Sequence, residues 1–345
     1  NNGFTGSIDN ISIKEVTGDQ PRLNYDISNG VVQSCPSLLL EPASTNLVTY
    51  SELFNTYLSV RVDATITDNY GISPDGSLNS SRIQFVDETS YCYAAISVFT
   101  SHTSSCYVKG VKGETVKFGI GANVATGQSF LLNGNWQRIE YTSSTANQIF
   151  FSTYSGVTAR DFEVFGLQLE ALSYATSYIP TSGQSAGVTR AAETCFGAGT
   201  SSTFNSTEGV LYVELSASNN NTFRAISLND GSSSNRVLLY LTTTNNQLRA
   251  TTNSGAVEQS NIIQSITDLT NYNKIAIRWQ LNNVSLWVNG VKLGEDLSAL
   301  NPIGLNNLSF DDNAAGSLPL YSNTKDVRVF NEALTDAQLT VLTTL

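Results

Sequence analysis

The chain has 345 residues, of which only 14% are charged, and it carries a net charge of −11. This length suggests two domains, each large enough to bury its own core. The acidic balance argues against nucleic-acid partners and anionic membrane surfaces, because both require a positively charged face. No apolar run approaches the ~20 residues of a spanning helix, so membrane insertion is not expected.

The first region in chain order is 1–34, for which we expect a strand and a linker. Residues 4–16 have the pattern of a terminal jelly-roll strand and resemble 161–172 in this respect. Breakers such as Gly18, Pro21 and Gly30 follow. The chain also lacks methionine. We therefore expect it to continue a further jelly roll that lies upstream.

The next region, residues 35–190, is predicted to be an antiparallel β-sandwich. Short runs of strand-forming residues recur between turns that carry Gly or Asn, and no helical period is visible. Ser73-Pro74-Asp75-Gly76 is one such turn, with Pro at its second position. The strands are expected at 58–67, 81–86, 91–100, 104–109, 115–122, 128–132, 136–142, 148–153 and 162–172.

A polar linker at 191–204 is followed by a second predicted sandwich at 205–345. Its clearest element is a hairpin at 274–291, in which Asn282 and Asn283 form a two-residue loop, because Asn tolerates positive φ. The chain ends in one strand and a short helix, for which Thr335 and Gln338 provide a capping box. The predicted fold class is all-β, with two antiparallel jelly-roll sandwiches in series.

Three segments resemble known families. The letters QLEALSYATSYIPT at 168–181 and SCPSLLLEPASTNLVTYSE at 34–52 resemble segments of fibre and appendage proteins of tailed bacteriophages. The first also looks like the closing strand of a carbohydrate-binding-module-like jelly roll. The ending DVRVFNEALTDAQ at 326–338, together with the W-x7-W-V-N-G hairpin, resembles concanavalin A-like, laminin-G-like domains.

These resemblances imply a non-enzymatic virion fibre or receptor-binding component of a tailed phage, located at the virion surface. Its expected partners are host cell-surface glycans, other copies of the chain, with a trimer as the first hypothesis, and other virion proteins. The alternative is a secreted location, as an accessory binding part or a catalytic part of a polysaccharide-degrading enzyme.

Catalytic chemistry is weakly supported, and no catalytic residue is predicted. The single histidine, His102, lies in a polar loop without the nearby carboxylate that a triad needs. Glu295 and Asp296 are adjacent, so in an extended strand they would point to opposite faces. Asp311, Asp312 and Asn313 could offer oxygen ligands to Ca²⁺. No cofactor is otherwise expected.

Aromatic side chains are the stronger indication of function, because flat rings cover the apolar faces of sugars. Trp287 is predicted to lie on the face of its hairpin opposite the core and to be covered by glycan or protein. Trp136 could be a core residue or a sugar platform. Together with Arg278, these are the candidate carbohydrate-binding residues, whereas Tyr91 and Tyr93 are expected to pack in the core.

Two further groups are interpreted structurally. Gln168 and Glu170 are expected to bond neighbouring backbone at a domain junction rather than to contact sugar. The four cysteines are too sparse for a disulfide scaffold and lack C-x-x-C spacing. They are predicted to be free thiols.

Overall fold

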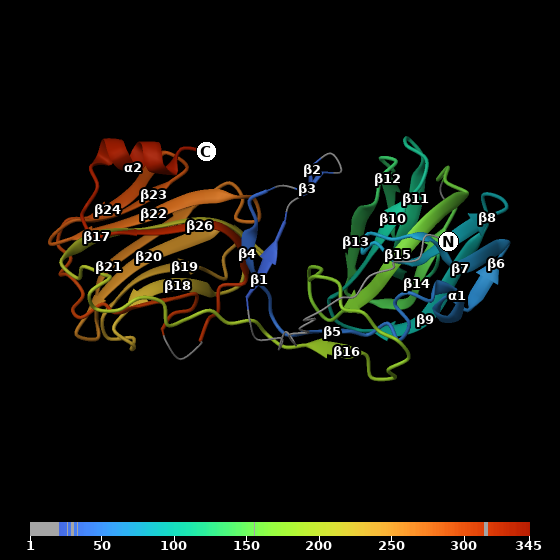
Figure 1. Ribbon diagram of the computed structural model, residues 1–345, viewed down its shortest axis with the longest axis horizontal. Helices are drawn as coiled ribbons and strands as arrows, with labels where there is room; N and C mark the ends of the chain where they lie inside the picture. Colours follow the sequence, from blue (N-terminus) through green and yellow to red (C-terminus); the bar gives the residue numbers. More distant parts are fainter. Residues whose placement is uncertain (1–20, 26, 29–30, 33, 155, 314–316) are drawn as a thin grey trace, which may run out of the picture.

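The computed structural model describes residues 21–25, 27–28, 31–32, 34–154, 156–313 and 317–345. The strand predicted at 4–16 lies outside them. The described chain forms two β-sandwiches, which lie beside each other along the long axis of the molecule (Figure 1). The predicted all-β fold class is confirmed. Among the described residues, no helix is long and apolar enough to cross a membrane.

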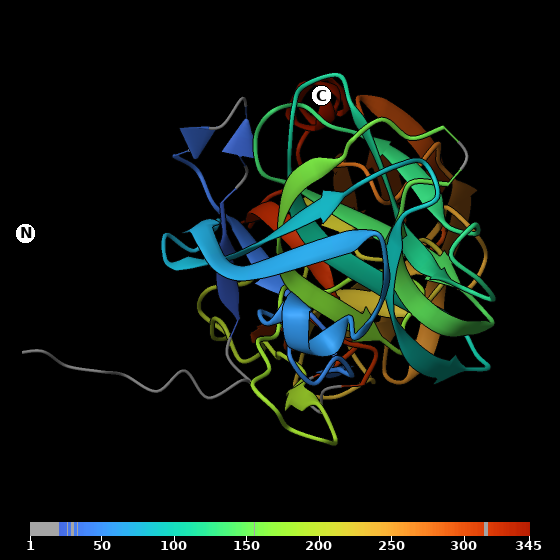
Figure 2. The same cartoon turned by 90° about the vertical axis from the view of Figure 1, so that its right-hand side faces the viewer.

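The first sandwich, which faces the viewer in Figure 2, contains two five-stranded antiparallel sheets. The first sheet has the order β13-β10-β15-β8-β7 and the second has the order β12-β11-β14-β9-β6. The first is built from β7 (Ala64–Ile72), β8 (Leu78–Phe85), β10 (His102–Lys109), β13 (Gln137–Ser143) and β15 (Asp161–Glu170). The second is built from β6 (Val60–Val62), β9 (Tyr91–Val98), β11 (Thr115–Gly121), β12 (Gln128–Leu131) and β14 (Ala146–Ser152).

Alternation along the strands builds the core of this sandwich. In β15, Phe162 and Val164 point inward, and Leu167 and Leu169 continue the inward row after a register shift. Gly166 lies within that shift with φ of +66°, and an added Cβ would lie 3.2 Å from the Tyr178 ring. Glycine suits this position because it adopts positive φ without strain.

The second sandwich packs a seven-stranded sheet, β1-β4-β26-β17-β22-β23-β24, on a five-stranded sheet, β21-β20-β19-β18-β25. Trp279 is its largest fully buried side chain. The seven-stranded sheet contains β1 (Arg22–Asn24), β4 (Ser37–Leu40), β17 (Glu208–Ala217), β22 (Asn273–Gln280), β23 (Val284–Val288), β24 (Val291–Asp296) and β26 (Ser322–Phe330). The five-stranded sheet contains β18 (Arg224–Asn229), β19 (Arg236–Leu241), β20 (Gln247–Ser254), β21 (Val257–Ser265) and β25 (Asn307–Ser309).

The predicted hairpin and the C-terminal helix are both confirmed. Asn282 has φ of +58° in the loop between β22 and β23. The helix α2 (Asp336–Thr343) begins at the N-cap Thr335, whose side chain forms the capping box with Gln338. The remaining elements are short: α1 (Phe54–Tyr57), the pair β2 (Ile27–Ser28) and β3 (Val31–Val32), and the pair β5 (Ser44–Asn46) and β16 (Val188–Arg190).

The segment Ser37–Leu40 lies inside the range predicted for the first sandwich, but it forms a strand of the second. Ser37–Leu40 pairs with β26 through Leu38 and Thr324, and on its other side with β1. The boundary predicted at residue 35 is therefore corrected, because the backbone of this short apolar run finds its partners in the C-terminal sheet. The chain consequently crosses between the sandwiches twice, and the two crossings pair with each other as β5 and β16.

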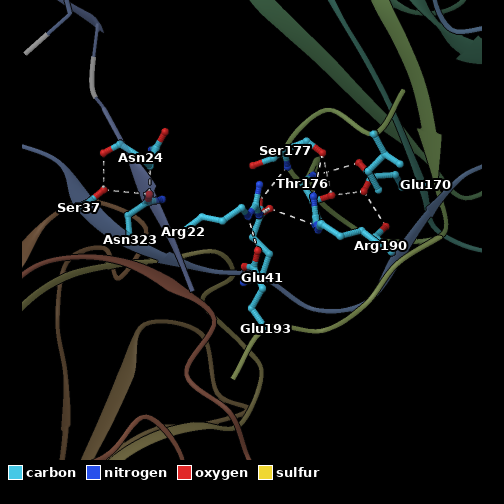
Figure 3. Close-up of polar contacts among 12 residues, drawn as sticks. Arg22, Asn24, Ser37, Glu41, Glu170, Thr176, Ser177, Arg190, Glu193 and Asn323 are labelled. Atoms are coloured by element: carbon cyan, nitrogen blue, oxygen red, sulfur yellow. Dashed lines mark hydrogen bonds and ion pairs between the residues drawn. The ribbon is translucent and has the colours of Figure 1, made fainter. Parts of the chain in front are cut away.

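A buried charge cluster lies at these crossings (Figure 3). The guanidinium of Arg22 bonds both Glu41 and Glu193, and Arg190 pairs with Glu41 at 3.0 Å. Glu193 is 1% exposed. Since Arg22 comes from β1 and the other three residues flank or belong to the crossings, the cluster ties both crossings to the second sandwich.

Candidate functional site

Trp287, a predicted sugar contact, is covered by the protein itself. Its ring lies on the face of β23 opposite the main core, as predicted, but is only 4% exposed. It packs in a second cluster with Tyr212, Ala276 and Leu339 of α2. Its Nε1 donates to Ser285 Oγ at 3.1 Å. Of the expected covers, glycan or protein, the protein is the one found: the chain's own C-terminal helix packs over the ring, so a sugar does not reach it.

Arg278 belongs to the same structural contact. It is 6% exposed and donates to the Asp336 carboxylate at 2.7 Å and to the Leu334 carbonyl at 3.1 Å. A second donor reaches Asn283 Oδ1 at 3.1 Å. These bonds fix the start of α2 on the sheet. Its predicted role as a sugar contact is therefore replaced by one in holding the helix.

The predicted oxygen ligands for Ca²⁺ have protein partners. The carboxylate of Asp312 accepts from Ser317 and lies 3.7 Å from Arg236, and Asp311 Oδ1 accepts from the backbone of Asn313 at 3.0 Å. In the described part of the chain, no three His, Cys, Asp or Glu side chains gather closely enough to hold a metal ion.

The other titratable candidates are dispersed. His102 Nδ1 lies 3.0 Å from the Thr100 carbonyl oxygen. Glu295 pairs with Lys292, and Asp296 accepts from Ser298 at 2.8 Å. Each of these side chains therefore has a partner close to it in the sequence.

The interpretation of Gln168 and Glu170 as junction residues is confirmed. Both are fully buried at the end of β15. Gln168 accepts from the Ile179 backbone at 2.7 Å and donates to the Thr176 carbonyl at 3.2 Å. Glu170 accepts from the Thr176 backbone at 3.0 Å and from Ser44 Oγ at 2.6 Å. This phage-like motif therefore closes its own loop onto the strand.

Trp136 is the one predicted sugar contact whose ring remains partly exposed. It lies just before β13, and its Nε1 donates to the Ile72 carbonyl at 3.2 Å. The Lys109 ammonium lies 5.8 Å from the centre of the ring. Trp136 lies next to β13 at one edge of the sheet, and Ile72 ends β7 at the other edge. For the two to bond, the end of β7 must cross the outer face of the sheet, the face that points away from the core.

A groove of about 240 Å³ is formed where β7 crosses this face. We name it the β7–β15 groove. Gly71 lies so close to the face that an added Cβ would be 2.3 Å from Glu163 Oε2, which explains the glycine at this point. The groove is lined by Tyr70, Arg82, Lys109, Gly110, Val111, Asp161, Phe162 and Glu163, with Trp136 beside it.

The strand register explains how the charged residues come together. Lys109 is paired with Glu163, and Glu163 with Arg82, so that three neighbouring strands present a row of alternating charge. Asp161 shares this face because it lies two residues from Glu163 in the same strand. The ammonium of Lys109 is 3.3 Å from Glu163, and Arg82 bonds Asp161 through two nitrogens.

The pairing of Arg82 with Asp161 shifts the pKa of both side chains. The hydrogen bond to Arg82 holds the pKa of Asp161 below its ordinary value, against a smaller opposing effect of burial. The same bond raises the pKa of Arg82, whose guanidinium also lies 4.8 Å from the Tyr70 ring. The groove therefore presents cationic hydrogen-bond donors, from Arg82 and Lys109, and carboxylate acceptors, from Asp161 and Glu163, beside two aromatic rings.

Sequence reasoning identified Trp136 but missed the charged residues around it. Asp161 and Glu163 alternate along one strand, as do Tyr107 and Lys109 along another, and this periodicity was visible. Which strands are neighbours was not visible, because β8, β15 and β10 are widely separated in the sequence.

The second sandwich matches a known family. Residues 197–340 fit the model described as the concanavalin A-like lectin/glucanases superfamily, in agreement with the resemblance seen at 205–345. The match supports a lectin-type jelly roll for this part of the chain. No curated protein matches the chain.

Several solved structures are similar over less than half of the chain. CBM40 of the Ruminococcus gnavus IT-sialidase, bound to alpha2,3 sialyllactose, is 13% identical with a TM-score of 0.34, covering 44% of this chain and 94% of that one. Domain 4 of the Geobacillus stearothermophilus arabinanase AbnA, in complex with arabinotriose, is 14% identical with a TM-score of 0.34, covering 40% and 68%. A SAP-like pentraxin from Limulus polyphemus is 12% identical with a TM-score of 0.31, covering 42% and 72%.

Proposed function

We propose that this protein recognises glycans without acting on them chemically, and that the β7–β15 groove is a site of recognition. The observation that carries the proposal is the pairing of Arg82 with Asp161 and of Lys109 with Glu163 beside Tyr70 and Trp136. Sugar hydroxyls both donate and accept, so a row of paired charges can bond them while the rings cover their apolar faces.

A non-enzymatic role fits the protonation of the groove. Glycoside hydrolysis needs one carboxylic acid whose pKa is raised so that it can protonate the leaving group. Asp161 has the opposite perturbation, since Arg82 lowers its pKa. Glu163 accepts from Ser80 at 2.7 Å and pairs with Lys109. Asp161 is thus held as an acceptor, and the contacts of Glu163 are those of a structural ion pair.

We further propose that the glycans are those of a host cell surface and that the chain is a fibre or receptor-binding component at the surface of a tailed-phage virion. The two phage-like segments, 34–52 and 168–181, support this assignment. In such an assembly, other copies of the chain and other virion proteins would be its partners, with three copies as the first hypothesis. Mass spectrometry of purified particles tests this role: the chain's absence from every particle would contradict it.

The groove is tested by measuring binding of the full chain to an array of bacterial surface polysaccharides. Trp136→Ala and Arg82→Gln should each weaken binding by about tenfold or more, since each removes a ring or an ionic contact from the site. Phe99→Ala is the matched control, because Phe99 is 83% exposed and does not line the groove. Binding that survives both groove variants would refute the assignment.

A further inference from the structure

The second sheet of the first sandwich carries a different surface on its outer face. Tyr91 and Tyr93 flank Cys92 in β9, and Cys92 points into the core, so both tyrosines point away from it. Their expected place in the core is therefore corrected. Both rings are half-buried and lie 6.1 Å apart with 29° between their planes, and Tyr154 lies 6.2 Å from Tyr91.

Neighbouring strands complete this surface, which we name the tyrosine face. Val62 is paired with Tyr91 and Val60 with Tyr93, and the two valines are 37% and 39% exposed. On the other side of β9, Gln148 is paired with Ala95, which lies two residues beyond Tyr93 and therefore on the same face. The tyrosine face thus comprises Val60, Val62, Tyr91, Tyr93, Ala95, Gln148 and Tyr154.

The outer face of the other half of this sheet, over β11 and β14, is covered by a turn at 122–127. Ser152 Oγ donates to the Val124 carbonyl at 2.7 Å, and the Lys117 ammonium donates to the Ala125 carbonyl at 3.1 Å. Phe150, which is paired with Tyr93, is fully buried near Gly127. The turn therefore stands beside the tyrosine face and limits it on one side.

The chemistry of the tyrosine face distinguishes it from the groove. Among the described residues whose side chains alternate onto this face, the charged one is Lys117, which is 4% exposed. Arg61, which is paired with Cys92, alternates to the opposite side and donates to the Leu58 carbonyl and to Asn55 Oδ1. Gln148 Oε1 has no hydrogen-bond partner. Because this oxygen is buried, the Gln148 side chain must turn outward before water or a ligand can donate to it. On its strands the face therefore combines rings and an amide without an exposed cation, and the exposed carboxylate Asp63 directly follows Val62.

We infer that the tyrosine face is a second carbohydrate-binding surface, specific for a neutral polysaccharide. The rings would cover apolar sugar faces, and hydroxyls would bond the Gln148 amide. An anionic sugar is disfavoured because the described strands present no exposed cation on this face to compensate for its desolvation. The inference is independent of the β7–β15 groove, which lies on the other sheet of the same sandwich.

Two surfaces on opposite sheets would let one chain contact a polysaccharide at two points or bridge two polysaccharide chains. Linking two sites raises the apparent affinity without new contacts, because the second binding event becomes intramolecular. Loss of either surface should therefore weaken binding of a ligand that reaches both, whereas a ligand of one surface should respond to one set of variants only.

The test is affinity electrophoresis of the full chain in native gels that contain dextran, galactomannan or hydroxyethylcellulose as neutral probes and alginate as an anionic probe. At least one neutral probe should retard the protein. A Tyr91→Ala/Tyr93→Ala variant should lose about tenfold or more of that affinity, whereas Tyr93→Phe, which keeps the ring, should retain most of it. Circular dichroism checks that each variant is folded.

Three outcomes would overturn the inference. Retardation by none of the neutral probes would exclude the ligand class. Equal retardation of the wild type and the folded double variant would exclude the surface. If light scattering shows a wild-type oligomer that the double variant converts to a monomer, the tyrosine face is instead a contact between copies. Trp136→Ala serves as the control for the groove: loss of neutral-probe binding in this variant alone would assign that binding to the groove.

Discussion

The two sandwiches differ in what covers the outer faces of their sheets. In the second, α2 packs Leu339 over Trp287 and Tyr212. On its other sheet, outward-facing Asn229 is fully buried and bonds its neighbours, including Ser227 at 2.9 Å. In the first sandwich, outward aromatic residues on both sheets remain partly exposed, whereas in the second this holds for Tyr240 on the five-stranded sheet but not for Trp287. An outward ring on a strand is therefore available to a ligand only where no further layer is present.

The sandwich that matches the family model is therefore not the one that presents the candidate carbohydrate-binding surfaces. The second sandwich carries the match to the lectin and glucanase superfamily, yet its one outward tryptophan is enclosed. The first sandwich presents Trp136 and Tyr70 at a groove and the tyrosine face on the opposite sheet. We accordingly expect variants of the first sandwich to change binding and variants of the second to change stability.

The largest expected effect is on Trp287. Trp287→Ala should lower the free energy of unfolding by about 3–5 kcal/mol, because it removes a buried ring and leaves a cavity under α2. Chemical denaturation followed by intrinsic fluorescence measures this loss, and binding to polysaccharide should persist in the folded variant. If the variant instead loses polysaccharide binding and keeps its stability, Trp287 is a ligand contact and the second sandwich, not only the first, binds the ligand.

A smaller effect is expected at the junction. Glu170→Gln replaces an acceptor with a donor facing Thr176 and Ser44, so buried groups lose their partners, at a cost of about 1–3 kcal/mol. The matched control is Glu258→Gln, which breaks the more exposed pair with Arg249 and should cost less than about 1 kcal/mol. Unfolding in urea measures both.

This pair of variants also tests the meaning of the phage-like motif. If Glu170→Gln keeps full stability but abolishes glycan binding, the motif contacts sugar and its structural interpretation is wrong. If stability falls and the folded variant still binds, the motif closes the loop and holds the junction, as its contacts indicate.

The smallest effect concerns thiol reactivity. All four cysteines are free in the structure; Cys92 and Cys106 are buried in the first core, Cys195 is half-buried and Cys35 is exposed. Burial raises the pKa of Cys92 to about 12 and raises that of Cys106 as well. Because the thiolate is the reactive form, alkylation of the native protein at pH 8 should modify Cys35 first and leave the two core thiols unmodified.

Mass spectrometry after alkylation without reductant provides the reference. Under denaturing conditions all four cysteines should carry an adduct. Two adducts or none would reveal disulfides and contradict the prediction of free thiols. Rapid native alkylation of Cys92 would show that the first core opens more readily than its packing suggests.

Much of the architecture could be predicted from local patterns. Alternation and turn residues indicated the strands, and positive φ at Asn282 and the capping box at Thr335 followed from side-chain chemistry. The assignment of Ser37–Leu40 failed because a short apolar run does not specify its pairing partner. That partner, β26, lies almost three hundred residues away along the chain.

The candidate surfaces depended more heavily on tertiary structure. The sequence alone determined which face of a strand each residue occupies, because side chains alternate with a period of two. It therefore placed Trp287 opposite the core correctly. Only the tertiary structure decided that α2 covers Trp287, that β7 crosses the outer face to Trp136, and that Lys109, Glu163 and Arg82 meet on three strands. The reason is physical: alternation is a local property of the backbone, whereas exposure and charge pairing depend on which distant segments pack against that face.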